Sequence, residues 1–322
     1  MLVQTQEQIP LTAVKPLEEG LLAYRAHCIA VTRAALRERQ DARPFPLQPA
    51  GDIEGLSYGR CPTTGGWFLM QQPSPESWRR VLHDVSRFRR SPEGFHAGLA
   101  QSRADHVYAP KLEWISETLR LQRLHRPLML EAMTEHSHFT TLLRDSGFCS
   151  EVVPIEEMDL AQGIGKARRC PEGIQAAVLL ESLDRVPHPQ QLLRHVAGWL
   201  QDGGLLFVTA LVASGFDVAV LGLNNLYLYP PDRMNCFSLD GLLRLLKQSG
   251  FELVEVSTPG ALDVQIVQAH RQRDPTLPLS TFERQLLDVH GEGQAVQTFL
   301  QQSRLSSFAR IVASKRIRMM MA

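Results

Sequence analysis

Side chains that can contact a ligand occur first in the segment 127–147. An apolar strand is expected at Leu128–Leu130, and it ends in an acidic residue, Glu131, before a helix-like run begins near Phe139. This order is typical of a nucleotide-binding corner, where glycines let the backbone approach the ligand. Three other residue types stand in this turn: Met133, Glu135 and Ser137. Their side chains are expected to occupy space that a bound ligand needs.

Two further polar positions come at the ends of predicted strands. Glu156 ends the apolar run 150–156, and Leu183 is followed by Asp184 and Arg185 at the end of the run 174–183. Strands that alternate with helices build a parallel sheet whose ligands lie at the carboxyl ends of the strands. Glu131, Glu156 and the loop after Leu183 are therefore expected along one edge of a sheet.

From residue 111 onward the apolar periodicity alternates between helix and strand. Helices are expected at 111–125, 188–204 and 238–250, the last with Ser238 as its cap. Strands are expected at 127–132, 150–156, 174–183, 205–211, 251–258 and 308–315. The alternation predicts an α/β fold with a mostly parallel sheet and helices on both faces.

The first 110 residues are organised differently. An amphipathic helix is expected at 16–40, followed by a small β-hairpin at 55–70 that turns at Gly65 and Gly66. Ser74 or Ser77 is expected to cap the next helix. The sequence thus predicts an N-terminal helix, hairpin and linker helices at 1–110, and a second domain at 111–322 with a helical insertion at about 276–304.

Several phrases resemble the class I S-adenosylmethionine-dependent methyltransferases, and are closest to a bacterial branch with a cysteine-bearing ribbon before the methyltransferase domain. The clearest are QDGGLLFVTA and CFSLDGLLRLLKQSGFELVEV, and the likeness extends from Leu56 to Arg316. It implies a Rossmann-like methyltransferase fold for residues 111–322 and a degenerate zinc-ribbon-like hairpin in the extension. It also implies that the short interval 157–175 lacks a helix or the third strand of that fold.

The resemblance assigns the corner after the first strand to the cofactor. In that family three alternating glycines let the backbone pass under the methionine and ribose of S-adenosylmethionine, and Met133, Glu135 and Ser137 take those positions. A side chain at each fills cofactor volume and, where φ is positive, adds strain of about 1 kcal/mol. Glu131 and Glu156 remain to position the cofactor, although a solvated loop carboxylate explains Glu156 equally well. Binding of S-adenosylmethionine is therefore expected to be weak or lost.

On the acceptor side, the resemblance implies that five residues face a substrate: Asp184, Arg185, Tyr229, Arg233 and Asn235. Arg185 and Arg233 stand where the family usually has histidine. The ribbon keeps Cys61 but has Thr64 at the position of the second cysteine, and a zinc site needs four ligands. The HxH pattern at 136–138 lacks a third ligand. No metal is expected.

Composition bears on three properties: nucleic-acid binding, cellular compartment and membrane insertion. Lys+Arg 34 balance Asp+Glu 34 at a sequence pI near 7.2, which leaves no basic field for nucleic acid. Five scattered cysteines predict a cytoplasmic protein without a disulfide scaffold. The apolar run 205–229 has nearly the length of a membrane span, but Asp217, Asn224 and Asn225 interrupt it, so no span is expected.

Two functions remain open. The preferred one is a degenerate methyltransferase homologue, a pseudoenzyme, that serves as an interaction, regulatory or accessory subunit. The alternative is an active S-adenosylmethionine-dependent enzyme with a remodelled cofactor loop, acting on a small-molecule or sugar-like substrate. Apolar stripes at Leu21–Leu36 and in the segment 280–303 predict a protein partner or a homo-oligomer. Alternatively, both segments pack on their own chain.

Overall fold

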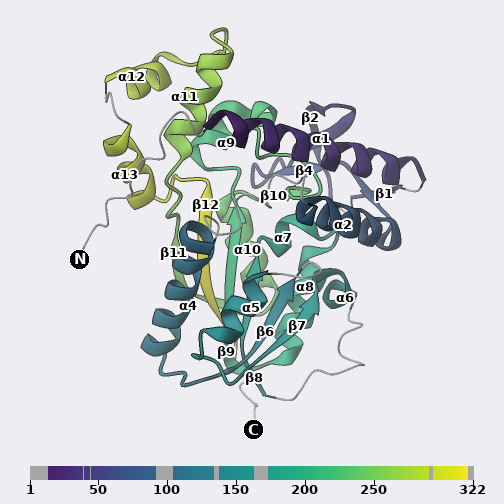
Figure 1. Cartoon of the computed structure of the whole chain (residues 1–322), viewed down its shortest axis with the longest axis vertical. Coiled ribbons are helices and arrows are strands. Elements are labelled where there is room, and N and C mark those ends of the chain that lie inside the picture. Colours follow the sequence, from purple (N-terminus) through teal and green to yellow (C-terminus); the bar gives the residue numbers. More distant parts are fainter. Residues whose placement is uncertain are drawn as a thin grey trace.

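The computed structural model describes residues 14–38, 40–43, 45–91, 104–133, 138–162, 173–289 and 293–317. Figure 1 shows a six-stranded sheet in the lower half of the molecule, with a layer of helices and β-ribbon at the upper right and a group of helices at the upper left. No helix in these ranges is long and apolar enough to cross a membrane.

The main sheet is mostly parallel, as the sequence predicts. Its strands are β6 (Leu128–Met133), β7 (Glu151–Glu156), β8 (Ile174–Leu180), β9 (Leu200–Leu211), β11 (Phe251–Ser257) and β12 (Phe308–Lys315). They lie in the order β11-β12-β9-β8-β6-β7. The pairs β7–β6, β6–β8 and β8–β9 are parallel. Strand β12 runs antiparallel to both β9 and β11. The carboxyl ends of β6, β7, β8 and β9 therefore share one edge.

Four helices cover the two faces of this sheet: α4 (Ala109–Leu121), α5 (His138–Asp145), α8 (Pro189–Trp199) and α10 (Leu239–Gln248). Successive strand residues point to opposite faces, so each strand contributes to two apolar layers. Leu130 and Leu179 pack in the layer that contains the buried residues of α8 and α10. Met129 and Val178 pack in the layer that contains those of α4 and α5. Helices thus lie on both faces, as expected.

The connection between β7 and β8 runs from residue 157 to residue 173. Its described part holds one short helix, α6 (Glu157–Ala161), and no strand. Residues 163–172 lie outside the described ranges. Within those ranges β7 is consequently the edge strand next to β6, and the described sheet lacks the strand that the resemblance places beyond it.

The N-terminal region is built into the same body. It consists of α1 (Val14–Glu38), β1 (Gln40–Ala42), β2 (Gln48–Ile53), β3 (Leu56–Arg60), β4 (Trp67–Leu69), β5 (Gln71–Pro73) and α2 (Pro75–Arg90). The predicted hairpin is β3 and β4, and Ser74 is the cap of α2, since its hydroxyl accepts from the Ser77 amide. The ribbon is larger than predicted because β10 (Asn235–Cys236) pairs with β4 and joins the two regions.

Four helices form a separate apolar cluster beside the sheet: α9 (Phe216–Leu221), α11 (Asp263–Arg273), α12 (Thr281–Val289) and α13 (Gln294–Gln302). Leu287, Val296 and Leu300 of the predicted stripes are buried there. Phe282 and Phe299 are not, with 69% and 53% of their surface exposed. The two helices thus pack on their own chain through part of each apolar stripe and leave Phe282 and Phe299 exposed.

Candidate functional site

The first two strand ends hold the residues that the resemblance assigns to a cofactor. Met133 ends β6 and lies in register with Glu156, which ends β7 and is half-buried. The prediction that Glu131 lies at the strand end was wrong, because β6 continues past it to Met133. Its side chain is buried, with 2% of its surface exposed. Glu135 and Ser137 lie outside the described residues. The structure thus places the ends of β6 and β7 side by side.

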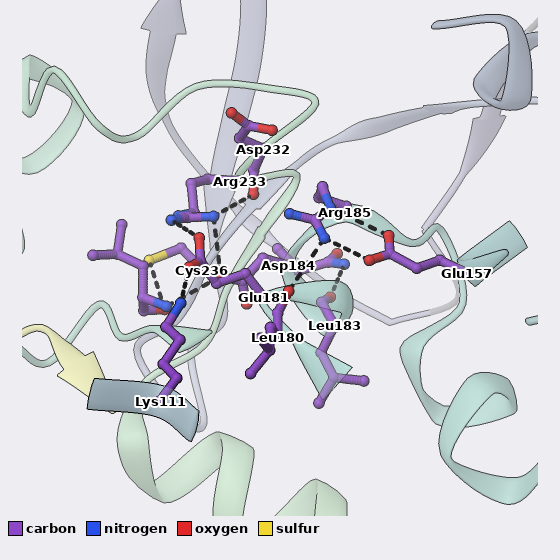
Figure 2. A network of polar contacts seen from close by, with 12 residues as sticks. Lys111, Glu157, Leu180, Glu181, Leu183, Asp184, Arg185, Asp232, Arg233 and Cys236 are labelled. Carbon is purple, nitrogen blue, oxygen red and sulfur yellow. Dashed lines mark hydrogen bonds and ion pairs between the residues drawn. The ribbon is translucent and has the colours of Figure 1, made fainter. Parts of the chain in front are cut away.

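Glu181 is the central carboxylate of the edge. It directly follows β8 in a left-handed conformation, at φ 60°, and is the residue before α7 (Ser182–Arg185). Its two oxygens bind two cations: Arg233 Nη2 at 2.6 Å and Lys111 Nζ at 3.3 Å. Figure 2 shows this arrangement, with Lys111 approaching from α4 and Arg233 from the loop before β10. Burial acts to raise the pKa of Glu181, but Arg233 and Lys111 outweigh it and hold that pKa well below its usual range.

Asp184 lies beside this pair and has no exposed surface. Its Oδ2 accepts from the Leu211 amide at 3.1 Å and lies 3.4 Å from Arg233 Nη1. Burial raises the pKa of Asp184 to about 8, against the opposing attraction of Arg233. The protonated form of Asp184 is therefore favoured to a higher pH than in an exposed aspartate.

Arg185 forms a second, tighter ion pair in the same edge. Its Nη2 lies 2.5 Å from Glu157 Oε1 and its Nε lies 3.2 Å from Glu157 Oε2, so the two groups bind in a bidentate manner. Nη2 also donates to the Leu180 carbonyl at 3.2 Å. The side chains of Arg185 and Glu157 are 12% and 1% exposed. Both arginines that replace histidine in the resemblance are thus committed to carboxylates of the same chain.

Asn235 is hydrogen-bonded to the backbone on both sides of Arg185. Its amide donates to the carbonyls of Leu183 and Val186, each at 2.8 Å, and its Oδ1 accepts from Arg43 Nη1 at 2.7 Å. Tyr229 is buried, with 4% of its surface exposed. The polar side chains expected to face a substrate are therefore bonded within the chain: Arg185 and Arg233 to carboxylates, Asp184 to the Leu211 amide, and Asn235 to backbone carbonyls and Arg43.

The N-terminal region covers this edge through hydrogen bonds to backbone carbonyls. Trp78 Nε1 of α2 donates to the Arg185 carbonyl at 2.6 Å, and the Gln72 amide donates to the Pro187 carbonyl at 2.7 Å. The Tyr58 hydroxyl donates to the Arg233 carbonyl at 2.9 Å. Trp78, Gln72 and Tyr58 are all buried. The ribbon and α2 thus fix the positions of both loops that carry the predicted acceptor residues.

No group of three or more metal-ligating side chains occurs among the described residues. Cys61 begins the turn of the hairpin, where its amide donates to the Gly66 carbonyl and its carbonyl accepts from the Gly65 amide, each at 2.8 Å. The turn keeps the shape of a hairpin loop with one thiol in it.

Sequence reasoning missed Lys111, Glu157 and Glu181. The signal for Glu181 was present, because an acidic residue follows the apolar run Ile174–Leu180, but the strand was expected to continue to Leu183. Lys111 and Glu157 had no local signal. Each meets its partner across 70 and 28 residues of chain respectively, through the packing of α4 and α6.

Comparison with known proteins agrees with this fold. Residues 111–256 match the family model described as a methyltransferase domain. No curated protein matches the chain significantly. Among solved structures, a putative sarcosine dimethylglycine methyltransferase from Galdieria sulphuraria is 13% identical, with 65% of this chain and 86% of that chain covered and a TM-score of 0.41. The 1,6-didemethyltoxoflavin-N1-methyltransferase from Burkholderia thailandensis, solved with S-adenosylhomocysteine bound, is 12% identical, with coverages of 84% and 100% and a TM-score of 0.43.

A complex of the Trm112 methyltransferase activator and a putative methyltransferase from Haloferax volcanii gives 10% identity, coverages of 74% and 98%, and a TM-score of 0.40. Likenesses this distant carry no information on the ligand or partner of this chain. Residues 111–256 thus match a methyltransferase domain, and the strand order of the described sheet agrees with a Rossmann-like methyltransferase fold.

Proposed function

We propose that this chain is a methyltransferase-fold protein that acts as an accessory or regulatory subunit and not as a catalyst. One observation carries the proposal: the charged residues at the carboxyl edge are used within the chain. Arg233 binds Glu181 and Asp184, Arg185 binds Glu157, and the loop that holds Arg185 is fixed by Trp78. An acceptor substrate would have to break buried ion pairs before it could contact these groups.

The charge at this edge also disfavours the cofactor. S-adenosylmethionine carries a positive sulfonium, which would approach the carboxyl end of β8, where Lys111, Arg185 and Arg233 already neutralise the nearby carboxylates. A further cation in a buried site is unfavourable, because charges interact strongly where water is excluded. The residues present therefore fit the cofactor poorly.

The active-enzyme alternative has one observation in its favour. Glu156 is half-buried at the end of β7, beside the end of β6, which is where the resemblance places the acid that accepts from the ribose hydroxyls. In that case Glu131 and Glu156 would position S-adenosylmethionine, and a small-molecule or sugar-like acceptor would lie near Asp184 and Arg233.

Titration calorimetry with S-adenosylmethionine and S-adenosylhomocysteine separates the two. The accessory role predicts no binding of either compound below about 1 mM, which is weaker than about 4 kcal/mol of binding free energy. Micromolar binding that the Glu156→Gln variant weakens at least tenfold would overturn it. The variant is needed because it distinguishes a specific ribose contact from weak association elsewhere.

An accessory role also requires a partner, and we place its surface on α12 and α13. Phe282 and Phe299 expose large aromatic surfaces on these helices. Light scattering at micromolar concentration is expected to show a homo-oligomer, or a pull-down from the source to retain a defined protein, and Phe282→Ser with Phe299→Ser is expected to abolish that assembly. Leu121→Ser is the matched control, because Leu121 is 64% exposed and ends a different helix, α4. A monomer that retains no partner would contradict this part of the proposal.

A further inference from the structure

A small recess lies between α2 and the loops at the carboxyl edge of the sheet. Its volume is about 10 Å³, which is room for about one water molecule. Six residues line it: Leu82, Val85, Ser86 and Arg89 of α2, Arg185 of α7, and Asp232 of the loop before β10. Two guanidinium groups and one carboxylate thus meet in a space otherwise walled by α2.

Asp232 is held in this recess by long contacts. Both of its carboxylate oxygens lie 3.3 Å from Arg89 Nη2, and Oδ2 accepts from the Tyr24 hydroxyl at 3.1 Å. Charge-assisted hydrogen bonds of this kind usually measure about 2.7–2.9 Å. The Arg185–Glu157 pair nearby measures 2.5 Å. The carboxylate of Asp232 is therefore bonded more loosely than its neighbour.

Arg89 has donor capacity to spare. Its Nη2 serves both Asp232 and the Tyr24 hydroxyl, whereas its Nε is buried and has no hydrogen-bond partner among the described residues. A guanidinium group recognises a carboxylate or phosphate best through two parallel N–H bonds. Asp232 contacts only Nη2 of Arg89, so the Nε–H donor of Arg89 is not used in this pair.

The recess favours negative charge. Burial acts to raise the pKa of Asp232, yet that pKa lies below its ordinary value because Arg89, Arg185 and Arg233 attract the ionised form. Burial raises the pKa of Tyr24 well above its usual range, so the tyrosine stays a neutral hydroxyl donor. The site thus offers a cationic group and a hydroxyl to whatever anion occupies it.

We infer that this recess is a binding site for an oxyanion, a carboxylate or phosphate group of a ligand, and that Asp232 fills it in this structure as an internal substitute. An incoming oxyanion displaces the Asp232 side chain, accepts from Arg89 through Nη2 and the unused Nε, and accepts from the Tyr24 hydroxyl. Because Asp232 precedes Arg233, the exchange shifts the loop that holds the Glu181 ion pair. This inference goes beyond the proposed function, since it holds whether or not S-adenosylmethionine binds.

Thermal unfolding of the full chain tests it. Asp232→Ala is compared with wild type in sodium formate, acetate and phosphate, each against sodium chloride at equal ionic strength. The variant is expected to have a lower Tm than wild type in chloride and to regain at least half of the difference in one oxyanion, with an apparent affinity at least tenfold higher than that of wild type. A larger effect of formate and acetate identifies a carboxylate ligand, and a larger effect of phosphate identifies a phosphorylated one.

Two further variants make the result specific. Arg89→Gln combined with Asp232→Ala removes the guanidinium and is expected to lose the anion response. Asp232→Ser also leaves the recess open and repeats the test if Asp232→Ala does not fold. The inference is overturned if neither Asp232 variant responds to oxyanions more than wild type, or if the double variant responds as strongly as Asp232→Ala.

Discussion

Replacing Arg233 by methionine is the most direct test of the ion-pair edge. Methionine keeps most of the apolar stem but removes the guanidinium that lies 2.6 Å from Glu181 and 3.4 Å from Asp184. Removal of one partner from a buried ion pair costs about 3–5 kcal/mol, because the remaining charge is left in a poorly solvating environment. Lys111 still contacts Glu181 at 3.3 Å, which places the expected loss near the lower end, at about 3 kcal/mol.

Asp184 gives this prediction a pH dependence. Its folded-state pKa of about 8 lies above the unfolded value, so the stability it contributes is complete at low pH and is lost as pH rises through about 8. Without Arg233 that pKa rises further. Asp184 is therefore mostly protonated in both proteins at pH 6.5, and the deficit of the variant comes mainly from the stranded Glu181. Above pH 8 the deficit is expected to widen, because wild type ionises Asp184 beside Arg233 and the variant cannot.

Urea unfolding followed by fluorescence, at pH 6.5 and pH 9, measures both effects. Arg244→Met is the matched control, because Arg244 pairs with Asp240 at 2.8 Å on an exposed helix face, where such pairs contribute at most about 1 kcal/mol. A loss for Arg233→Met no larger than that of the control would refute the view that this edge is a buried, committed network.

Three other predictions concern separate parts of the chain. Asp217 is buried and lies near Asp263, and burial together with that carboxylate raises its pKa to about 6. Its contribution is therefore lost as pH rises through about 6, and Asp217→Asn is expected to be more stable than wild type at pH 8 by about 1–3 kcal/mol in urea unfolding. Trp78→Phe removes the 2.6 Å bond to the Arg185 carbonyl and is expected to lower the unfolding free energy by about 1–3 kcal/mol. Elemental analysis of the purified protein is expected to find less than 0.1 zinc per chain, as about one per chain would require ligands beyond Cys61.

The sequence predicted the frame because its signals are local. The apolar run at β8 and the alternation of helices and strands predict the parallel sheet, and the described part of the interval after Glu157 contains no strand. Ser74 was one of two serines predicted to cap α2, and it directly precedes Pro75, the first residue of that helix. Errors arose where tertiary packing decided the outcome. Glu131 was expected at a strand end, but pairing with both β7 and β8 extends β6 past it.

The candidate site was only half predictable for the same reason. Arg185, Arg233 and Asp184 were found through the resemblance, because their positions in the chain are fixed by strands that are easy to place. Their partners were not found, since Lys111 and Glu157 reach the edge through helices whose rotation about their own axes no local pattern specifies. The net charge did not indicate a cluster of ion pairs either, because the chain is neutral overall.

The same contacts connect the stability of the fold to the question of ligand access. The carbonyls of Arg185 and Arg233 are held by Trp78 and Tyr58 of the N-terminal region, and the side chains of both arginines are held by carboxylates. An acceptor that entered along this edge would therefore loosen α2 and the ribbon as well as two ion pairs. Binding free energy would have to exceed that cost, which for the Arg233 pair alone is about 3 kcal/mol. The anion site beside Arg89 needs a smaller rearrangement, because only the loosely bonded Asp232 must leave, and so it is the place where a ligand acts on this edge with the fold intact.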